Sequence, residues 1–464
     1  MPPLPPNIHR TTILKTIPAW EQKTMARRDT HTRHISSRFP SQPSKDTSWV
    51  NPSLPPGASR LAQPKGSLRQ PRSLFPTENE WLLLYTAPLQ PRDSGAPPGS
   101  VALAYDASAF VLGYPNVSGE ISGVRTFEYN TSTDTFDDLG SVLSGNTDFY
   151  LKYGRAVAIG VNSTLGSILA VGVPNGNGNL AGAVQTLALV GNSWIAQDTT
   201  SANTGVINGM EYGSALSISN YDSGTAGYYL AVGGPGANIV EVMKIQSGGS
   251  FSSYVSTSIG GTGEFGTSVA ISNYLDGAMR VVGGAPAGTD GYVRISELDG
   301  GSWITQDITI SNSDFGASVS ISGDGTILAV GDPLNSTVRI YYDNSGTWSL
   351  IGGVVLTGQN STSQFGQAVS VNRDASSSSL IGTIVAIGEP KYSLPTRTEC
   401  GRVLVMEYLA TGWTPVLNSI YGLNEDEEFG QSVMLAPGGE YFVAGGGPDI
   451  GRTAVYGTGP LIDD

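Results

Sequence analysis

The sequence predicts an all-β protein, a seven-bladed β-propeller built from four-stranded blades. A Gly-x-Pro motif recurs about every 50 residues, and self-similarity at such a period indicates a repeat architecture. The 61 glycines and a charged fraction of only 14% suit a protein of many short strands and turns. The seven motifs lie at Gly113 and Pro115, Gly172 and Pro174, Gly233 and Pro235, Gly284 and Pro286, Gly331 and Pro333, Gly388 and Pro390, and Gly446 and Pro448.

Residues 1–77 differ in composition from the rest, which predicts a disordered basic leader ahead of a propeller at residues 78–464. They are rich in Pro, Ser, Arg and Gln and lack a periodic apolar pattern. Residues 1–100 hold 13 of the 25 basic and 6 of the 39 acidic residues, a net charge of +7 against −21 for the remainder. No apolar run of secretory length follows Met1, so we expect no standard signal peptide. The basic stretch from Arg10 to Arg28 leaves three alternatives open: a transit-type peptide, an unstructured tail or a wrongly assigned gene start.

Each repeat unit is expected to contribute four antiparallel strands in chain order. In the fifth unit the first strand begins at the pair Phe315 and Gly316, and a turn at residues 323–325 closes the first hairpin. The second strand is the apolar run before Gly-x-Pro, where proline ends the pairing because it cannot donate to a ladder. A third strand follows at residues 338–342, and an aromatic residue such as Trp348 marks the fourth. Sheets packed radially bury both faces, which explains why these strands are apolar or small throughout.

An aromatic–Gly pair opens most units and is expected to be structural. The ring would wedge between adjacent blades, where its burial stabilises the fold. Glycine at a strand end lets two backbones approach where a side chain would clash. The pairs are Phe265 with Gly266, Phe315 with Gly316, Phe365 with Gly366 and Phe429 with Gly430, and the tyrosine equivalents are Tyr153 with Gly154 and Tyr212 with Gly213.

The two ends of the repeat region predict how the ring closes. The last unit has three strands, and residues 80–87, with Trp81 as the aromatic marker, form an orphan fourth strand before the first unit. Because an open sheet edge promotes aggregation and ring closure removes it, we expect residues 80–87 to complete the last blade beside residues 453–456. The first unit departs from the pattern, since Pro97 and Pro98 replace the aromatic–Gly pair, and we expect its inner edge to be displaced.

At these motifs the chain resembles the FG-GAP repeat family, whose best-known members form the seven-bladed propeller heads of integrin α-chains. The resemblance covers residues 79–458, and Gly-Ala-Pro matches literally at Gly284, Ala285 and Pro286. It implies a binding or cell-adhesion scaffold, extracellular in the best-studied members, without catalytic residues common to the family. We therefore expect a monomeric protein that is not an enzyme and that binds a protein or a glycan through loops on one face.

The resemblance also implies calcium in the first hairpin of some units. Calcium needs about 6–8 oxygen ligands, so several carboxylates must lie in one short loop. The closing aspartate of the family pattern is Tyr229 in one unit and Arg280 in another, which leaves too few ligands. We expect no metal or other cofactor, and the alternative to calcium binding is plain turn chemistry. The weak metal candidates are Asn220, Asp222, Asn273 and Asp276.

Two loops are candidates for ligand recognition, because long loops on a rigid scaffold usually carry binding surfaces. One follows the sixth Gly-x-Pro motif, and the other is an acidic run that enters the last blade. The acidic run could hold a cation or a basic partner, or it could be a solvated loop that aids solubility. The candidates are Glu389, Lys391, Tyr392 and Arg397 in the first loop and Glu425, Asp426, Glu427 and Glu428 in the second.

Composition excludes several function classes for the repeat region. All three histidines lie in the leader, which excludes histidine-dependent catalysis or metal binding in the propeller. An acidic repeat region lacks the basic footprint that nucleic acid requires, and no apolar run is long enough to predict a transmembrane helix. The single cysteine, Cys400, excludes an intramolecular disulfide and favours a reducing compartment, against the extracellular location that the resemblance implies. The localisation therefore stays open.

Two alternative functions remain: a carbohydrate-active hydrolase or lyase on a propeller scaffold, and a structural scaffold with no dedicated ligand. Glycoside hydrolysis needs two carboxyl groups at a defined separation. The repeat spacing does not single out such a pair. A cluster of two or three carboxylates with an Arg or Tyr in one cleft would distinguish this enzyme from a binding scaffold.

Overall fold

The computed structural model describes residues 81–458, apart from 88–99, 105–106, 116–121, 134, 145–151, 162–165, 175–180, 203–207, 220–226, 247, 274–278 and 448–451. All of the described residues fall within the compact unit Pro71–Asp464. The predicted leader, residues 1–77, and the Pro97 and Pro98 pair lie outside the described residues. Among the residues that are described, no helix is long and apolar enough to cross a membrane.

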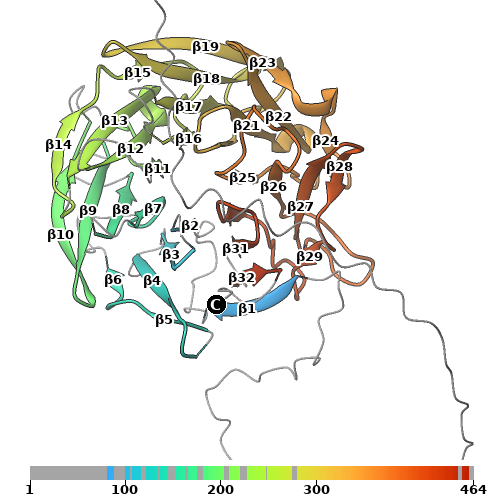
Figure 1. The fold of residues 1–464 in the computed structure, drawn as a ribbon, viewed down its shortest axis with the longest axis horizontal. Coiled ribbons are helices and arrows are strands. Elements are labelled where there is room, and N and C mark those ends of the chain that lie inside the picture. Colours follow the sequence, from blue (N-terminus) through green and yellow to red (C-terminus); the bar gives the residue numbers. More distant parts are fainter. Residues whose placement is uncertain are drawn as a thin grey trace, which may run out of the picture. The chain divides into compact units, whose positions relative to one another are not determined.

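Seven antiparallel sheets surround a central channel, so the predicted seven-bladed propeller is confirmed (Figure 1). Blade 1 comprises β2 (Val101–Leu103), β3 (Ala109–Tyr114), β4 (Gly123–Asn130) and β5 (Thr135–Asp138), with β6 (Leu143–Ser144) beside β4. Blade 2 comprises β7 (Val157–Gly160), β8 (Ile168–Val173), β9 (Ala183–Val190) and β10 (Ser193–Thr200). Blade 3 comprises β11 (Ala215–Ile218), β12 (Gly227–Gly234), β13 (Ile239–Gln246) and β14 (Phe251–Tyr254), with η1 (Pro235–Ala237) and β15 (Ile259–Gly260).

The next three blades repeat this order from the innermost strand outward. Blade 4 comprises β16 (Ser268–Ile271), β17 (Arg280–Ala285), β18 (Asp290–Asp299) and β19 (Ser302–Ser311). Blade 5 comprises β20 (Ser318–Ile321), β21 (Ile327–Asp332), β22 (Thr337–Asn344) and β23 (Thr347–Leu350), with η2 (Pro333–Asn335), η3 (Ile351–Gly353) and β24 (Leu356–Thr357). Blade 6 comprises β25 (Ala368–Val371), β26 (Ile384–Glu389), β27 (Arg402–Leu409) and β28 (Gly412–Pro415), with β29 (Ile420–Tyr421).

Blade 7 is built from both ends of the propeller, as the orphan strand predicts. It comprises β30 (Ser432–Leu435), β31 (Tyr441–Gly445), β32 (Thr453–Gly457) and, on its outer edge, β1 (Leu82–Ala87). The β1 strand runs antiparallel to β32, with Leu83 opposite Tyr456. The Trp81 side chain is only 6% exposed, and its ring lies 5.0 Å from that of Phe442 in an edge-on contact. The predicted closure of the ring is therefore confirmed for Trp81 and β1, whereas Glu80 lies outside the described residues.

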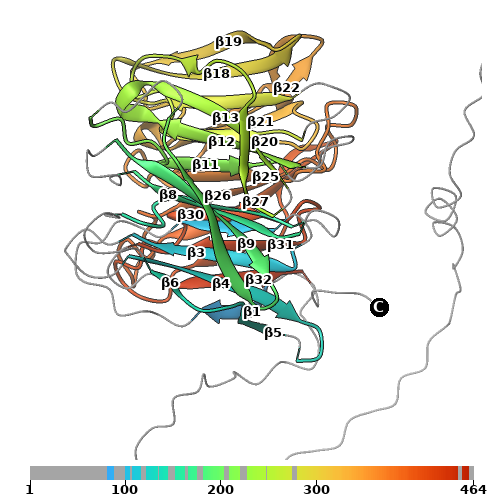
Figure 2. The same cartoon turned by 90° about the vertical axis from the view of Figure 1, so that its left-hand side faces the viewer.

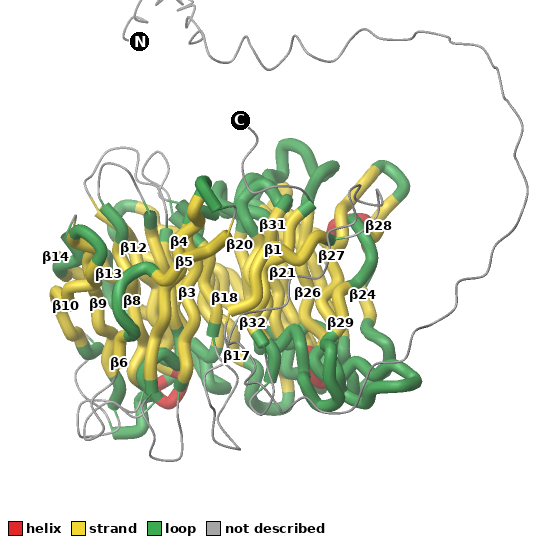
Figure 3. The backbone as a smooth tube through the Cα atoms, turned by 90° about the horizontal axis from the view of Figure 1, so that it is seen from below, coloured by secondary structure: helices red, strands yellow, loops and turns green. Residues whose placement is uncertain are grey.

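The strands run between two layers of loops, which form the two faces of the propeller (Figure 2, Figure 3). We call one the motif face, because the Gly-x-Pro turns and the aromatic–Gly pairs lie there. The other is the hairpin face, which carries the turns between the first and second strands of each blade, such as residues 322–326.

The two repeat glycines meet where neighbouring blades touch. A side-chain carbon added to Gly331 would lie well under 3.0 Å from the carbonyl oxygen of Gly366 in the next blade, closer than real Cβ atoms come. The Ser318 hydroxyl donates to that same carbonyl oxygen at 2.8 Å. Only hydrogen fits at such a contact, which explains why the motif keeps glycine. The equivalent contacts are Gly113 with Gly154, Gly172 with Gly213, Gly233 with Gly266, Gly284 with Gly316, and Gly388 with Gly430.

The opening glycines lie in turns ahead of the first strands, whereas the sequence predicts them at strand ends. Gly266 lies two residues before the first residue of β16, and Gly430 lies two residues before the first residue of β30. Their φ angles, 97° for Gly266 and 102° for Gly430, fall in the left-handed region that favours glycine. The prediction that the aromatic–Gly pair begins the first strand is therefore wrong for Gly266 and Gly430, because the chain must turn through this conformation before pairing starts.

The interface between blades 7 and 1 differs from these six. Ser432 pairs with Gly445 as Ser318 pairs with Gly331, so Gly445 rather than Gly446 occupies the motif position. The Gly-x-Pro pattern predicted Gly446 for this position, which is one residue too late in the chain, because this unit has an additional glycine before its proline. The buried Ser432 hydroxyl, which corresponds to the donor Ser318, has no hydrogen-bond partner in the part of the chain that the structure describes.

The aromatic residue of each pair lies in a core shared by two blades. Phe315 is fully buried and packs in one cluster with Val282 of blade 4 and Leu328 of blade 5. The Arg339 guanidinium lies 5.6 Å from the centre of the same ring. This ring therefore joins consecutive blades through apolar burial and a cation–π contact.

Replacing Trp81 by alanine should weaken the closure of the ring. Loss of the buried indole and its contact with Phe442 should lower the free energy of unfolding by about 3–5 kcal/mol. The control is Leu83→Ala on the same strand, whose side chain is 53% exposed and whose loss should cost about 0.5 kcal/mol or less. Urea unfolding followed by tryptophan fluorescence would measure both, and equal small losses would contradict a closing role for β1.

The glycine contact predicts a second stability effect. Gly331→Ala should lower the free energy of unfolding by about 1–3 kcal/mol, because the added methyl group forces blades 5 and 6 apart. Gly260→Ala is the matched control, since a side-chain carbon there would meet nothing within 4 Å. Thermal unfolding by circular dichroism would compare them, and a Gly331→Ala variant as stable as the control would refute the steric argument.

Candidate functional site

The candidate loops of blades 6 and 7 lie on the motif face and are joined to each other. The Lys391 ammonium lies 2.6 Å from a Glu399 carboxylate oxygen and also pairs with Glu428. The Arg397 guanidinium donates to the carbonyl oxygen of Gly422. The structure thus brings the two predicted loops together, with their basic residues engaged by acidic and carbonyl groups.

Two of the other candidates anchor the base of the first loop. Glu389 is fully buried, pairs with Arg402 and accepts a hydrogen bond from the Gln359 amide at 2.5 Å. The Arg402 guanidinium lies 4.2 Å above the Tyr392 ring, which in turn lies 5.4 Å from the Tyr421 ring. Glu389 therefore holds the blade together, whereas Tyr392 and Tyr421 form a partly exposed aromatic pair on the motif face.

The acidic run is only half solvated. Glu425 and Asp426 are exposed, as a solvated loop requires. Glu427 instead is fully buried. Its carboxylate accepts hydrogen bonds from Arg452 Nε at 2.8 Å and from the backbone amide of Leu423 at 2.6 Å. The expectation of a wholly solvated loop is wrong for Glu427, because Arg452 of the same blade neutralises its charge.

Of the four weak metal candidates, Asn273 alone lies among the described residues. Asn220, Asp222 and Asp276 lie outside the described residues. The Asn273 side-chain oxygen accepts a hydrogen bond at 2.9 Å from Arg373 Nη2. Within the described residues, no group of three or more His, Cys, Asp or Glu side chains is placed to hold a metal ion. A metal-free propeller stays a prediction.

Sequence reasoning missed a pair of carboxyl groups on the motif face of blade 5. Asp314 directly precedes Phe315, and Asp332 is the middle residue of the fifth Gly-x-Pro motif. The Asp332 side chain lies close enough to Asp314 to raise the pKa of that carboxyl group. Asp332 is fully buried and accepts from Asn335 Nδ2 at 3.1 Å.

The wider surroundings of this pair combine one cation with several neutral donors. Arg339 Nη1 lies 3.4 Å from Asp332 Oδ2, and the Leu334 amide donates to Asp314 Oδ1 at 2.7 Å. The sequence did carry a signal, since the fifth unit has an aspartate both directly before its aromatic–Gly pair and inside its Gly-x-Pro motif.

The pair changes the protonation of Asp314. Burial raises the pKa of Asp314 from 3.8 to about 6; the Leu334 amide opposes this rise, whereas the hydrogen bond and the negative charge of Asp332 add to it. Asp314 therefore still carries its proton in part at mildly acidic to neutral pH. A carboxylic acid with such a pKa suits general acid catalysis near neutral pH.

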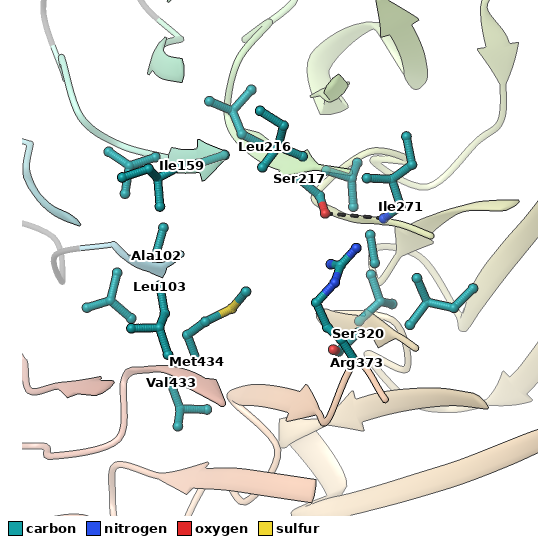
Figure 4. A pocket seen from close by; sticks show the side chains of 18 of the residues that line it. Ala102, Leu103, Ile159, Leu216, Ser217, Ile271, Ser320, Arg373, Val433 and Met434 are labelled. Atoms are coloured by element: carbon teal, nitrogen blue, oxygen red, sulfur yellow. Dashed lines mark hydrogen bonds between the residues drawn. The ribbon is translucent and has the colours of Figure 1, made fainter. Parts of the chain in front are cut away.

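The central channel is the second candidate site (Figure 4). It encloses a cavity of about 200 Å³, and residues from the innermost strands of all seven blades line it. Most of the lining is Val, Ile, Leu and Ala, with Met434 from β30 and the hydroxyl groups of Ser217 and Ser320. Arg373, which follows β25, projects into the cavity from the hairpin face.

A chain of hydrogen-bonded turns fixes Arg373 at the channel. The Gly323 amide donates to the Arg373 carbonyl oxygen at 2.7 Å, and the Asn273 amide donates to the Gly323 carbonyl oxygen at 2.8 Å. On the other side the Asp374 amide donates to the Pro437 carbonyl oxygen at 3.2 Å. The first turns of four consecutive blades are thereby linked around the hairpin-face mouth of the channel.

Comparison with known proteins bears on the fold more than on the site. No family model matches the chain, and no curated protein matches it either. Similar solved structures include putative 6-phosphogluconolactonases from Bacteroides uniformis ATCC 8492 and Bacteroides fragilis NCTC 9343. The first has a TM-score of 0.49 and 15% identity over 72% of this chain and 88% of its own. The second has a TM-score of 0.47 and 12% identity over 76% of this chain and 89% of its own.

These comparisons change two expectations. The seven-bladed propeller stands, but membership of the FG-GAP family is not shown, and cell adhesion, an extracellular location and a monomeric state stay predictions. The expectation that the protein is not an enzyme is withdrawn, since the similar structures carry the name of an enzyme; at this degree of similarity they show the fold alone. A propeller of this architecture does not exclude catalysis.

Proposed function

We propose that the protein is a carbohydrate-active hydrolase whose reaction takes place on the motif face, with Asp314 as the proton donor. The observation that carries this proposal is the close pair of Asp314 and Asp332 on the motif face, in which burial first and the neighbouring Asp332 second raise the pKa of Asp314 to about 6. A titratable group perturbed by burial and by a specific charged neighbour is a candidate functional residue.

The chemistry of glycoside cleavage fits this donor. The glycosidic oxygen leaves readily only when an acid protonates it, and a carboxylic acid with a raised pKa is the usual donor; the attack on the sugar needs a second carboxylate about 5–9.5 Å away, a role that this proposal does not assign to Asp332. Asp314 is only half-buried and can reach a substrate, whereas Asp332 is fully buried. Asp332, paired with Arg339, therefore acts as a positioning residue, and it adds to the effect of burial, which is the main reason that Asp314 keeps its proton.

The motif-face loops of blades 5 and 6 carry features that support a glycan as the substrate. Gln359, which precedes blade 6, and Ser393 exchange two hydrogen bonds, of 2.9 and 3.1 Å, and so join the segment after blade 5 to the loop that carries Tyr392. Aromatic rings such as the Tyr392 and Tyr421 pair offer apolar faces on which sugar rings can stack. Leu334, 61% exposed and bonded to Asp314 through its amide, adds apolar surface beside the donor.

Removal of the proton donor tests this proposal. Asp314→Asn should lower kcat on a cleaved polysaccharide by about 100-fold or more while KM changes little, because the amide cannot donate the catalytic proton. Reducing-sugar release from a polysaccharide panel would identify the substrate for the unaltered chain. Asp299→Asn, an exposed acid on the hairpin face, is the control and should keep full activity. Absence of turnover on every polysaccharide, or full activity of Asp314→Asn, would disprove the proposal.

The raised pKa of Asp314 also predicts how stability changes with pH. The folded chain holds this proton more tightly than the unfolded chain, so the resulting stabilisation is complete below about pH 4 and is lost as pH rises through about 6. Compared with Asp314→Asn, which does not titrate, the unaltered protein should lose stability between pH 4 and pH 7. Urea midpoints at four pH values would measure this difference, and parallel profiles would show that the pKa of Asp314 is not raised.

A further inference from the structure

The outer strand of blade 4 is the longest outer strand that the structure describes. β19 spans ten residues at the rim of the propeller, and among the described strands it is hydrogen-bonded to β18 alone (Figure 1). Its pairing with β18 is continuous from Ser302 to Ser311. Four of the other outer strands have only four residues, and the remaining two, β1 and β10, contain register shifts. Proteins usually shorten, bend or charge such edges, because an open edge pairs with other chains.

The backbone of β19 leaves every second peptide group at the free edge, because these groups alternate between the two sides of a strand. The Leu298 amide donates to the Met279 carbonyl oxygen at 3.0 Å, which directs the backbone groups of Leu298 towards β17. The groups of its neighbour Asp299 therefore face Ser302 of β19. It follows that the outward N–H and C=O groups of β19 belong to Trp303, Thr305, Asp307, Thr309 and Ser311.

The side chains of β19 do not protect this edge. Six of its ten residues are Trp, Ile or Thr, which favour strands, and none is Lys, Arg, Pro or Gly. Its one charged residue, Asp307, accepts hydrogen bonds of 2.7 Å from both Nε and Nη2 of Arg294 on β18. Ile304 is 60% exposed and lies on the same side of the strand as Ile308, which packs against the core between blades 4 and 5.

Blade 2 shows how nearly the same sequence is protected. β10 begins Ser-Trp-Ile-Ala-Gln-Asp and β19 begins Ser-Trp-Ile-Thr-Gln-Asp, so Ile195 of β10 corresponds to Ile304. The pairing of β10 shifts register between Ala196 and Asp198, and the Asp198 carboxylate accepts a hydrogen bond at 2.8 Å from the Phe251 amide of blade 3. The edge of β10 is thus interrupted and held by the next blade, whereas that of β19 is regular.

We propose that β19 is a dimerisation surface, at which two copies of the chain join their blade 4 sheets by antiparallel pairing of β19 with β19. When Gln306 lies opposite Gln306 of the second copy, the outward backbone groups of the two strands face each other and exchange hydrogen bonds. Ile304 then lies opposite Ile308 of the second copy, an apolar pair on one side of the sheet. Shifting one strand by two residues would instead place the two Asp307 side chains opposite each other, which is unfavourable for like charges.

The charges around β19 favour a second copy over a charged partner. Because Arg294 neutralises Asp307 within the same blade, the strand neither requires a basic partner nor strongly repels its own copy. At longer range the net charge of −14 opposes association, and salt screens that repulsion, so the dimer should become tighter as salt is added. This inference replaces the expectation of a monomer and does not depend on the proposed hydrolase activity.

Sedimentation of the full chain over a series of concentrations tests this inference. The unaltered chain should form a dimer, and Ile304→Lys should weaken it by about 10-fold or more, because a lysine on an edge strand opposes pairing. The matched control is Ile195→Lys, at the equivalent exposed position of β10, which should dimerise like the unaltered chain. Equal dimerisation of the two variants would overturn the surface. An unaltered chain that stays monomeric would overturn the pairing of copies and leave the edge to an extended segment of another protein.

A disulfide tests the register of the pairing. Gln306→Cys would place two thiols opposite each other at a Cα separation of about 4.5 Å, which a disulfide can span. Oxidised glutathione should therefore convert this variant to a covalent dimer, while the native Cys400 is buried. Thr305→Cys is the control and should cross-link far less, because its thiol would lie opposite Asp307 of the second copy. Equal cross-linking of the two variants, or none in Gln306→Cys, would overturn the proposed pairing.

Discussion

The structure depends on one repeated contact, in which the motif glycine, the last but one residue of the second strand of a blade, meets the glycine that opens the next blade. The contact leaves room only for hydrogen, and it sets how closely consecutive blades approach near the axis. Within blades 2 to 7 the opening glycine also donates its amide to the carbonyl oxygen of the motif glycine, as Gly316 does to Gly331 at 3.0 Å. That bond brings residues beside the two motifs together, and it is what places Asp314 against Asp332. The same geometry sets the width of the channel into which Arg373 projects.

The motif face also carries a second repeated feature, an arginine near the start of the third strand with an aromatic ring and a carboxylate as neighbours. Arg339 contacts Phe315 and Asp332, and Arg452 contacts Phe429 and Glu427. Buried carboxylates of this kind are tolerated only when a cation and hydrogen bonds compensate them. In blade 5 a second acid, Asp314, lies beside the compensated Asp332, and burial together with that neighbour raises the pKa of Asp314. The candidate catalytic group thus arises from a structural pairing with one extra carboxyl group.

The fold could be predicted from the sequence because its signals are local and repeated. Strand order follows from turns and apolar runs, and the closing role of Trp81 follows from counting strands. In blade 7 the Gly-x-Pro pattern points to Gly446, because an additional glycine precedes the proline. The strand register instead places Gly445 opposite Ser432, in the motif position. The candidate sites were harder to find. Neither the pairing of Glu427 with Arg452 nor the direction of the Arg373 side chain is encoded in a motif, since both depend on how loops from separate parts of the chain meet.

Blade 7 has a consequence for how the protein folds. Its outermost strand, β1, is synthesised before every other strand of the propeller, and its partner β32 is synthesised after them. Contacts between segments so far apart in sequence carry a large loop-closure cost and form slowly, whereas each of the other six blades is assembled from neighbouring strands. Six blades can therefore form in order during synthesis, while β1 remains unpaired until β32 is available. Pairing of β1 with β32 then completes blade 7 and joins the seven blades into one closed ring.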